Sequence, residues 1–269
     1  MNRNDDVLKS SETDTRRLYN DLSWTWPIIS PPEDYLEEGR FYTEKIRTRA
    51  RREGRSLLHL GCGGGHMDWA MKNNFRIRSI DISPHMLALA EKLNPEVTYS
   101  LGDMRTVRLD EKFDAVLIHD AINYMLTVDD LRAAFRTAFE HLKDDGLMIT
   151  SAEQWPENFV QHKIRPQTEK KDDIEITFIE HFYDPDPNDT HYECTFIYLI
   201  RRGGKLQVEF DRHLAGIFPL ESWRKTIMEV GFILEETEFT HSDFAENDSY
   251  PMFIGIKPST ATPKVISGK

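Results

Sequence analysis

The residues best placed for chemistry form a glycine-rich turn and a single acid that follows it. Gly61, Gly63 and Gly65 come directly after a short apolar run, and Asp81 lies twenty positions beyond Gly61. Glycines let a backbone pass close beneath a ligand because they carry no Cβ atom. A carboxylate at the tip of the next strand can accept hydrogen bonds from a ribose diol. Strand, glycine turn, helix, strand and acid together predict a nucleotide-binding βαβ unit.

The elements that must position these residues follow from the hydrophobic periodicity. Short apolar strands alternate with amphipathic helices, which predicts an α/β fold with a parallel sheet and right-handed crossovers. Ser83 and Pro84 supply an N-cap and a first-turn proline for one helix, and Thr127 with Asp130 resembles a capping box for another. The strands are expected at residues 56–60, 76–80, 97–101, 113–118, 147–151, 232–239 and 252–256.

The apolar period changes from helical to two in the second half of the chain. Between Ile174 and Leu214 the apolar residues alternate, and Gly203-Gly204 reads as a hairpin turn, so this segment is predicted to be antiparallel β structure. We expect the insertion to lie over the carboxyl ends of the parallel strands. His181 and His213 fall on its strands, where a surface or strand-pairing role is expected.

Four regions follow from these patterns. The aromatic residues of segment 19–26, which ends before Pro27, are expected either to cover a cleft or to cap the core, and residues 33–52 are predicted to be helical. The expected organisation is an N-terminal helical cap at 1–54, a Rossmann-like domain at 55–154 and 216–258, an antiparallel β insertion acting as a substrate lid at 155–215, and a disordered tail at 259–269.

Composition limits the classes of function. The chain has 269 residues and a formal net charge of −12, which argues against a nucleic acid as substrate because a phosphate backbone would be repelled. No apolar run reaches the length of a membrane span, and the charged N-terminus lacks a signal-peptide core. Two cysteines, Cys62 and Cys194, make neither a disulfide framework nor a metal cluster. We therefore expect a cytoplasmic protein without a metal, with a small-molecule partner and with a homodimer allowed.

The glycine spacing indicates which nucleotide is bound. A dinucleotide fingerprint, G-x-G-x-x-G, would need glycine where His66 stands. The observed G-x-G-x-G resembles motif I of the class I S-adenosylmethionine (SAM) methyltransferases, over roughly 57–258. That resemblance implies a seven-stranded Rossmann-like sheet with its last strand antiparallel. Features that resemble one branch, the N,N-dimethyltransferases of nucleotide-linked amino sugars, are Gly102-Asp103-Met104-Arg105, Pro156-Glu157-Asn158-Phe159, the β insertion and Phe253-Ile254-Gly255.

Three positions depart from that family pattern. His59 stands where an acid is usual two residues before the first glycine, which removes one polar anchor behind the cofactor. Tyr124 stands where the amino-sugar branch has a histidine, and Tyr250-Pro251 replaces an arginine near the final strand. The resemblance therefore supports cofactor binding more strongly than a sugar acceptor.

The resemblance implies SAM as cofactor and S-adenosylhomocysteine as product. Asp81 would bind the ribose hydroxyls and Asp103 the adenine amino group. For Asp103 the alternative is a turn-forming residue, and for His119 it is a packed, hydrogen-bonded histidine. The cofactor-binding residues that the resemblance implies are Tyr35, Gly61, Cys62, Gly63, Gly65, Asp81, Ile82, Met86, Asp103, Met104 and His119.

The implied chemistry is an in-line displacement at a methyl carbon on a positively charged sulfur. Orientation can supply roughly 7–11 kcal/mol, whereas a general base typically gives a factor of ~10²–10⁴, so positioning should dominate. An ammonium acceptor must first lose a proton, and Tyr19, His119 or Tyr124 are the candidates to assist.

These residues leave several functions open. The first hypothesis is a small-molecule methyltransferase, with N-methylation of an amino sugar or another amine preferred over O-methylation. The alternative is a non-catalytic SAM-binding or sensing protein that keeps the fold without transfer. A nicotinamide oxidoreductase is disfavoured by the glycine spacing.

Overall fold

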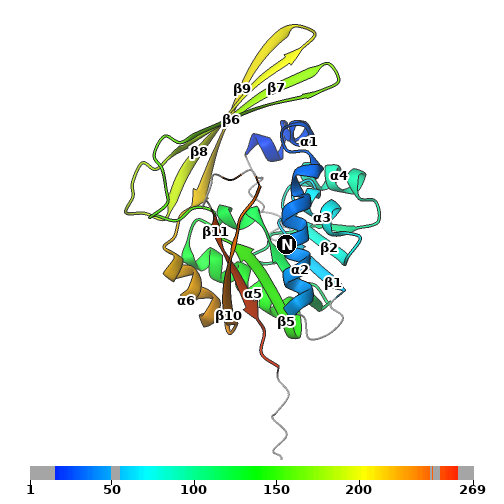
Figure 1. The fold of residues 1–269 in the computed structure, drawn as a ribbon, viewed down its shortest axis with the longest axis vertical. Helices are drawn as coiled ribbons and strands as arrows, with labels where there is room; N and C mark the ends of the chain where they lie inside the picture. Colours follow the sequence, from blue (N-terminus) through cyan, green and yellow to red (C-terminus); the bar gives the residue numbers. More distant parts are fainter. Residues whose placement is uncertain (1–15, 50–54, 243, 245–248, 260–269) are drawn as a thin grey trace, which may run out of the picture.

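The computed structural model describes residues 16–49, 55–242, 244 and 249–259, and these contain two β-sheets (Figure 1). The larger sheet has seven strands in the order β10-β11-β5-β4-β1-β2-β3. β1 to β5 run parallel, whereas β11 is antiparallel to both of its neighbours. The strands are β1 (Ser56–Leu60), β2 (Arg76–Asp81), β3 (Thr98–Leu101), β4 (Phe113–Ile118), β5 (Leu142–Ser151), β10 (Ile233–Phe239) and β11 (Tyr250–Ile256). This topology confirms the predicted fold class and the antiparallel last strand.

Helices cover both faces of the seven-stranded sheet. The helices are α2 (Leu36–Arg49), α3 (His66–Met71), α4 (Pro84–Leu93), α5 (Val128–His141) and α6 (Leu220–Val230). The Ser83 side chain accepts a hydrogen bond from the Met86 amide at the start of α4. Thr127 accepts one from the Asp130 amide at the start of α5. Both predicted caps are therefore confirmed.

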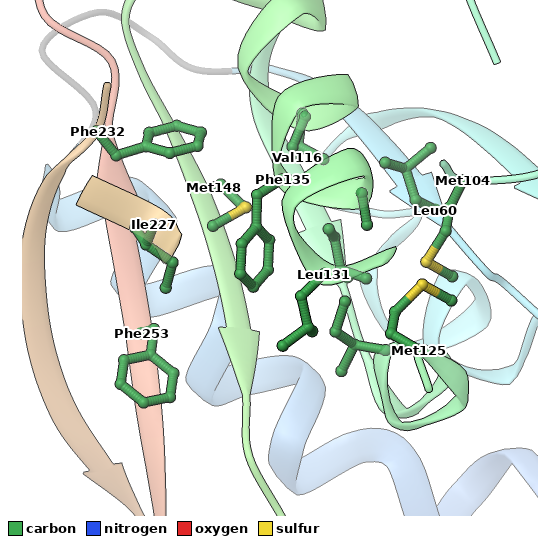
Figure 2. Close-up of a cluster of buried hydrophobic side chains, with 14 of the residues drawn as sticks. Leu60, Met104, Val116, Met125, Leu131, Phe135, Met148, Ile227, Phe232 and Phe253 are labelled. Atoms are coloured by element: carbon green, nitrogen blue, oxygen red, sulfur yellow. The ribbon is translucent and has the colours of Figure 1, made fainter. Parts of the chain in front are cut away.

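The core has two layers because successive strand residues point to opposite faces. Leu58 and Leu60 of β1 pack toward α5 and α6, where Figure 2 shows Phe135 and Leu131 meeting Met148, Ile227 and Phe253. Leu57 of β1 belongs to the cluster on the other face, beneath α2 and α3. All five residues of β1 are buried, as expected for the central strand of a parallel sheet. The sheet therefore holds the turn that follows β1 rigidly.

The insertion forms a second sheet of four antiparallel strands. The strands are β6 (Ile164–Lys171), β7 (Ile174–Tyr183), β8 (His191–Arg202) and β9 (Lys205–Gly216), and Figure 1 shows them above the seven-stranded sheet. Gly203 and Gly204 have φ of 55° and 78° in the predicted β8–β9 hairpin turn. β6 was not predicted. It is exposed along its whole length, so its sequence lacks the alternation that marks a half-buried strand.

The segment before α2 is a series of short helices between the two sheets. It comprises η1 (Arg17–Tyr19), η2 (Ser23–Thr25), α1 (Trp26–Ile29) and η3 (Pro32–Tyr35). Leu18, Leu22 and Ile28 join the buried cluster of the four-stranded sheet. The predicted helix at 33–52 therefore begins as a 3-10 turn, and its end lies outside the described residues. The predicted start of the chain at 1–15 and most of the expected disordered tail also lie outside them.

β5 begins five residues earlier than predicted. Leu142 directly follows α5, and the pairing of β4 with β5 shifts register between Phe113 and Ala115. Asp145 sits at this irregularity with φ of 61°. A bulge of this kind hides a strand from periodicity arguments, because one residue falls out of the alternation. Among the described residues, no helix is long and apolar enough to cross a membrane.

Candidate active site

A cavity of about 340 Å³ lies at the carboxyl edge of the parallel strands. Its floor includes Gly61 after β1, Asp81 at the end of β2, Asp103 after β3 and His119 after β4. Its roof comes from the inner face of the four-stranded sheet and from the segment before α2. In open α/β sheets, ligands bind in such a crevice outside the carboxyl ends of the strands.

The glycine turn forms one wall of this cavity. Gly61 has φ of +79°, and a Cβ atom there would lie 2.3 Å from the Cβ of Ala121. Gly63 has φ of +53°, and a Cβ atom there would meet no protein atom within 4 Å. Gly61 is therefore required by packing, whereas Gly63 keeps open the space that a ligand would use.

Gly65 does not line the cavity, contrary to its predicted role as a cofactor contact. Its φ is +76°, and a Cβ atom there would lie 2.7 Å from the Tyr99 hydroxyl and 2.9 Å from the Asn94 amide nitrogen. Asn94 also donates a hydrogen bond to the Gly65 carbonyl. This glycine is needed for the close approach of the turn to its neighbours. Gly64, which was not predicted, lines the cavity in its place.

Asp81 lines the cavity while bound to the backbone. Its Oδ2 accepts a hydrogen bond from the Gly63 amide at 2.7 Å, and its Oδ1 accepts one from the Ser83 amide at 2.8 Å. Burial raises the pKa of this carboxyl. Each carboxylate oxygen can accept a second hydrogen bond, so the pair fixes the orientation of the group without exhausting it.

The other predicted cofactor residues gather around Asp81. The guanidinium of Arg105 donates to Oδ2 of Asp103 from Nη2 at 2.6 Å and from Nε at 3.0 Å, and Nε also lies 3.1 Å from Oδ1. It also accepts from the Arg105 amide, so the turn-forming alternative describes part of its role. The other predicted contacts that also line the cavity are Tyr35, Cys62, Ile82, Met86 and Met104. Burial raises the pKa of the Cys62 thiol well above its usual value, which keeps it protonated. Contact of all these residues with a cofactor remains a prediction.

His59 keeps a polar group behind the glycine turn. It is buried, and its Nδ1 lies 2.7 Å from Oδ1 of Asp68 on α3. Asp68 is itself buried and accepts a second hydrogen bond from the Ser79 hydroxyl at 2.8 Å. The other ring nitrogen of His59, Nε2, is buried without a hydrogen-bond partner among the described residues, although His59 lines the cavity.

His119 is tied to two carboxylates. Its Nε2 lies 2.8 Å from Glu38 Oε2 and 3.0 Å from Asp120 Oδ1. Glu38 also accepts hydrogen bonds from the Tyr42 and Tyr250 hydroxyls. Burial alone would lower the pKa of His119, but Asp120 and Glu38 raise it well above its ordinary value. A histidine held in its charged form cannot take a further proton, which argues against the predicted role of His119 as a base.

The half of the cavity beneath the four-stranded sheet combines aromatic rings with acids. Burial raises the pKa of Glu180 on β7. Burial and the neighbouring Asp120 together raise the pKa of Glu153, after β5, well above its usual value. Arg165 on β6 lies over the Phe182 ring at 5.2 Å. The rings that line this half are Phe178, Phe182, Tyr192 and Phe196.

The two predicted phenols meet at the boundary between the halves. The Tyr19 and Tyr124 hydroxyls are 2.7 Å apart, and the Tyr124 hydroxyl is 2.8 Å from Nδ1 of His213. Nε2 of His213 is 2.7 Å from Oδ2 of Asp211. The surface role expected for His213 is wrong, because its side chain is buried and lines the cavity, whereas its expected pairing is found opposite Cys194 of β8. A buried Asp-x-His on an inward strand face was the available signal.

Aromatic residues also close the side nearest the glycine turn. Trp26 stacks on His66 with ring centroids 6.0 Å apart, and Tyr35 meets His66 edge to face. Burial lowers the pKa of His66 to about 4, so this ring is neutral at physiological pH. Segment 19–26 therefore covers a cleft through Tyr19 and Trp26, whereas Trp24 is exposed. Within the described ranges, no group of three His, Cys, Asp or Glu residues is arranged to hold a metal.

Comparisons with known proteins agree with this architecture. Residues 57–146 match the family model described as a methyltransferase domain. A Streptomyces venezuelae dTDP-3-amino-3,4,6-trideoxy-alpha-D-glucopyranose N,N-dimethyltransferase is 28% identical over 209 residues, which cover 77% of this chain and 86% of that enzyme.

Solved structures share the fold. The crystal structure of Streptomyces venezuelae DesVI superposes with a TM-score of 0.76 at 24% identity, covering 89% of this chain and 96% of that one. The SAM-bound amino pentose methyltransferase CalS10 of Micromonospora echinaspora gives 0.71 at 22% identity, covering 83% and 91%. At these identities the likeness establishes the fold, and the site must be argued from the residues of this chain.

Proposed function

We propose that this chain, whose residues 57–146 match a methyltransferase domain, transfers a methyl group from SAM to the nitrogen of a small-molecule amine, in the first place an amino sugar. The observation that carries the proposal is the single cavity in which the glycine turn and Asp81 meet an acidic, aromatic chamber. One half suits a nucleoside and the other suits a cationic acceptor.

The residues present fit SAM on three counts. Gly63 leaves open space where any other residue would place a Cβ atom. Asp81 is oriented by two backbone amides and retains capacity for the ribose hydroxyls. His59 lines the same cavity and has a buried ring nitrogen, Nε2, without a hydrogen-bond partner among the described residues. The amino-acid end of SAM would supply that partner. We assign the ribose to Asp81 and the adenine side to Ile82, Met86 and Asp103.

The acceptor chamber favours an ammonium group. Glu153 and Glu180 have raised pKa values because burial disfavours their charged forms, and a bound cation would restore those forms. Aromatic rings also attract a cation over their faces. A neutral hydroxyl acceptor would gain neither effect, so the chamber favours N-methylation over O-methylation.

The residues act mainly by binding, aligning and excluding water. When bound, SAM supplies a methyl group on a positively charged sulfur. The glycine turn and Asp81 hold the nucleoside, while Glu180 and the rings of the four-stranded sheet direct the acceptor nitrogen toward the methyl carbon. Transfer would form a bond from nitrogen to the methyl carbon and would break the carbon–sulfur bond, whose electron pair would stay on sulfur. Alignment of this kind can contribute about 7–11 kcal/mol.

The test is transfer of label from methyl-labelled SAM to dTDP-3-amino-3,4,6-trideoxy-α-D-glucopyranose. We expect mono- and dimethylated sugar with a matching yield of S-adenosylhomocysteine. The control acceptor is the same sugar nucleotide with a hydroxyl in place of the amine. Methylation of the hydroxyl compound would overturn N-transfer, and SAM binding without turnover of any amine would show a non-catalytic protein.

A further inference from the structure

We propose that Tyr19, Tyr124, His213 and Asp211 form a proton relay that accepts the acceptor's ammonium proton. This inference rests on the proposed function. The four side chains come from three separate parts of the chain: η1, the 3-10 helix η4 (Asp120–Tyr124) and β9. Consecutive polar atoms are 2.7, 2.8 and 2.7 Å apart, which is hydrogen-bond distance at every link.

The end of the relay fixes the direction of every bond in it. An ionised Asp211 can only accept, so Nε2 of His213 carries the proton that lies between them. Nδ1 of the neutral ring is then an acceptor, and the Tyr124 hydroxyl must donate to it. Tyr124 has one hydrogen, so Tyr19 must donate to Tyr124. The Tyr19 oxygen is left as an acceptor at the cavity wall, where an acceptor N–H can bind.

Proton transfer along the relay balances without any further reactant. The ammonium N–H proton passes to the Tyr19 oxygen, the Tyr19 proton to Tyr124, and the Tyr124 proton to Nδ1 of His213. The nitrogen regains its lone pair, and an imidazolium forms beside the Asp211 carboxylate. Burial raises the pKa of both phenols, so they pass protons on while neither stays ionised.

Asp211, at the far end of the relay, can stabilise a protonated His213. Burial opposes ionisation of Asp211, but the hydrogen bond from His213 brings the pKa of this carboxyl below its usual value. The Leu18 amide donates a further hydrogen bond to Asp211 at 2.7 Å. The guanidinium of Arg16 lies 3.8 Å from the Tyr124 ring centroid and 4.6 Å from that of Tyr19.

Other charged or titratable groups from each packed element also act on the relay. Near the phenols and Asp211 these are Arg16, Arg17, Asp21, Asp81, Asp120, Cys194 and Tyr198. Asp81 and Asp120 raise the pKa of Tyr19 further, whereas Arg16 lowers it. Because these charges act on the pKa of Tyr19 in opposite directions, the sequence of hydrogen bonds along the relay determines the direction of proton transfer.

The first test needs no turnover. In ¹⁵N-histidine NMR of the full chain with S-adenosylhomocysteine, His213, assigned by its loss in His213→Gln, should show the Nε2–H tautomer. Addition of dTDP-3-amino-3,4,6-trideoxy-α-D-glucopyranose should convert it to imidazolium. A resting Nδ1–H tautomer, or a ring that stays neutral with the amine bound, would overturn the relay.

The second test is the pH profile of kcat/KM with the same sugar. Tyr124→Phe and His213→Gln should lower kcat/KM about 10²-fold near neutral pH, the lower end of the range for a general base. The deficit should shrink as pH rises, because the amine then arrives already deprotonated. A constant deficit at every pH would indicate a structural role and overturn the relay, as would full activity of both variants.

His191→Gln is the matched control. His191 pairs with Asp189 at the same two-residue spacing in the same sheet, but it does not line the cavity. His191→Gln should show the same pH profile of kcat/KM as the parent. SAM affinity measured by titration should stay within twofold in all three variants, which shows that they are folded. Absence of methyl transfer by the parent would overturn the proposed function, and the NMR experiment would still decide the relay.

Discussion

The two glycines at either side of Cys62 have different tasks although both have positive φ. Gly61 fits against Ala121 and Met104, whereas Gly63 faces open space. Gly61→Ala should lose stability through backbone strain of about 1–2 kcal/mol and overpacking of about 1–3 kcal/mol. Gly63→Ala should carry only the strain and yet weaken SAM binding at least tenfold. Urea unfolding and titration with SAM distinguish the two effects. Tight SAM binding by Gly63→Ala would contradict this assignment.

Glu180 is the residue that should matter most for a cationic acceptor. Its pKa is raised by burial and by Asp120, against the nearby positive charges of Arg165 and Lys163. Glu180→Gln should raise KM for the amino sugar at least tenfold while SAM affinity is unchanged. Glu175→Gln on the same strand is the control, since Glu175 does not line the cavity. An equal change of KM in both variants would show that the charge of the sheet, and not this carboxylate, is responsible.

His59 and Asp68 should act together on the amino-acid end of SAM. His59→Phe removes Nε2, the nitrogen without a partner among the described residues, while Asp68→Asn leaves the ring but changes the group that orients it. Both substitutions should weaken SAM binding about tenfold, and adenosine affinity should stay near the parent value because adenosine lacks the amino-acid end. If calorimetric titrations showed an equal loss of affinity for SAM and adenosine, the role of His59 would be limited to packing.

At the level of elements, the start of α3 gives the protein a pH-dependent stability. Burial lowers the pKa of His66 to about 4. Between about pH 6.5 and pH 4 the histidine is therefore neutral in the folded state and protonated in the unfolded chain. This contribution is complete above pH 6.5 and is lost as pH falls toward 4. Between pH 7 and pH 5 it amounts to about 2 kcal/mol. His66→Phe, which keeps a ring on Trp26, should flatten the curve of unfolding free energy against pH. If the unfolding free energy of His66→Phe depended on pH as steeply as that of the parent, His66 would not be the source of the pH dependence.

The sequence predicted elements whose signals are local. The turn at 61–65, the caps at Ser83 and Thr127 and the Gly203-Gly204 hairpin depend on neighbouring residues and were correct. The relay was only half visible, because Tyr19 and Tyr124 were chosen while His213 was set aside. Its place depends on how β9 meets η4, 89 residues earlier, and that is a tertiary contact without a local signal. Gly65 shows a limit of the local signal itself, since a motif position does not tell a glycine needed for packing from one that lines the cavity.

For the whole molecule, ligand binding should appear as stability. Anything that binds the folded state alone adds about 2.7 kcal/mol at one hundred times its dissociation constant. SAM or S-adenosylhomocysteine at that concentration should raise Tm by about 5–10 °C, because each kcal/mol shifts Tm by about 2–4 °C in a chain of this size. Thermal melts with and without ligand measure this shift, and Gly63→Ala at the same ligand concentration should show at most about half of it. A ligand-independent Tm in the parent would contradict binding at the glycine turn.

The four-stranded sheet supplies both the roof of the acceptor chamber and the last two groups of the relay. Any motion that lifts β9 away from η4 to admit a substrate would part His213 from Tyr124. While the molecule is open, the acceptor would therefore remain an ammonium ion. Its nitrogen could not attack, because its lone pair would still be bonded to the proton. The acceptor would become reactive only after the chamber has closed around both substrates, so the same movement would control entry and activation.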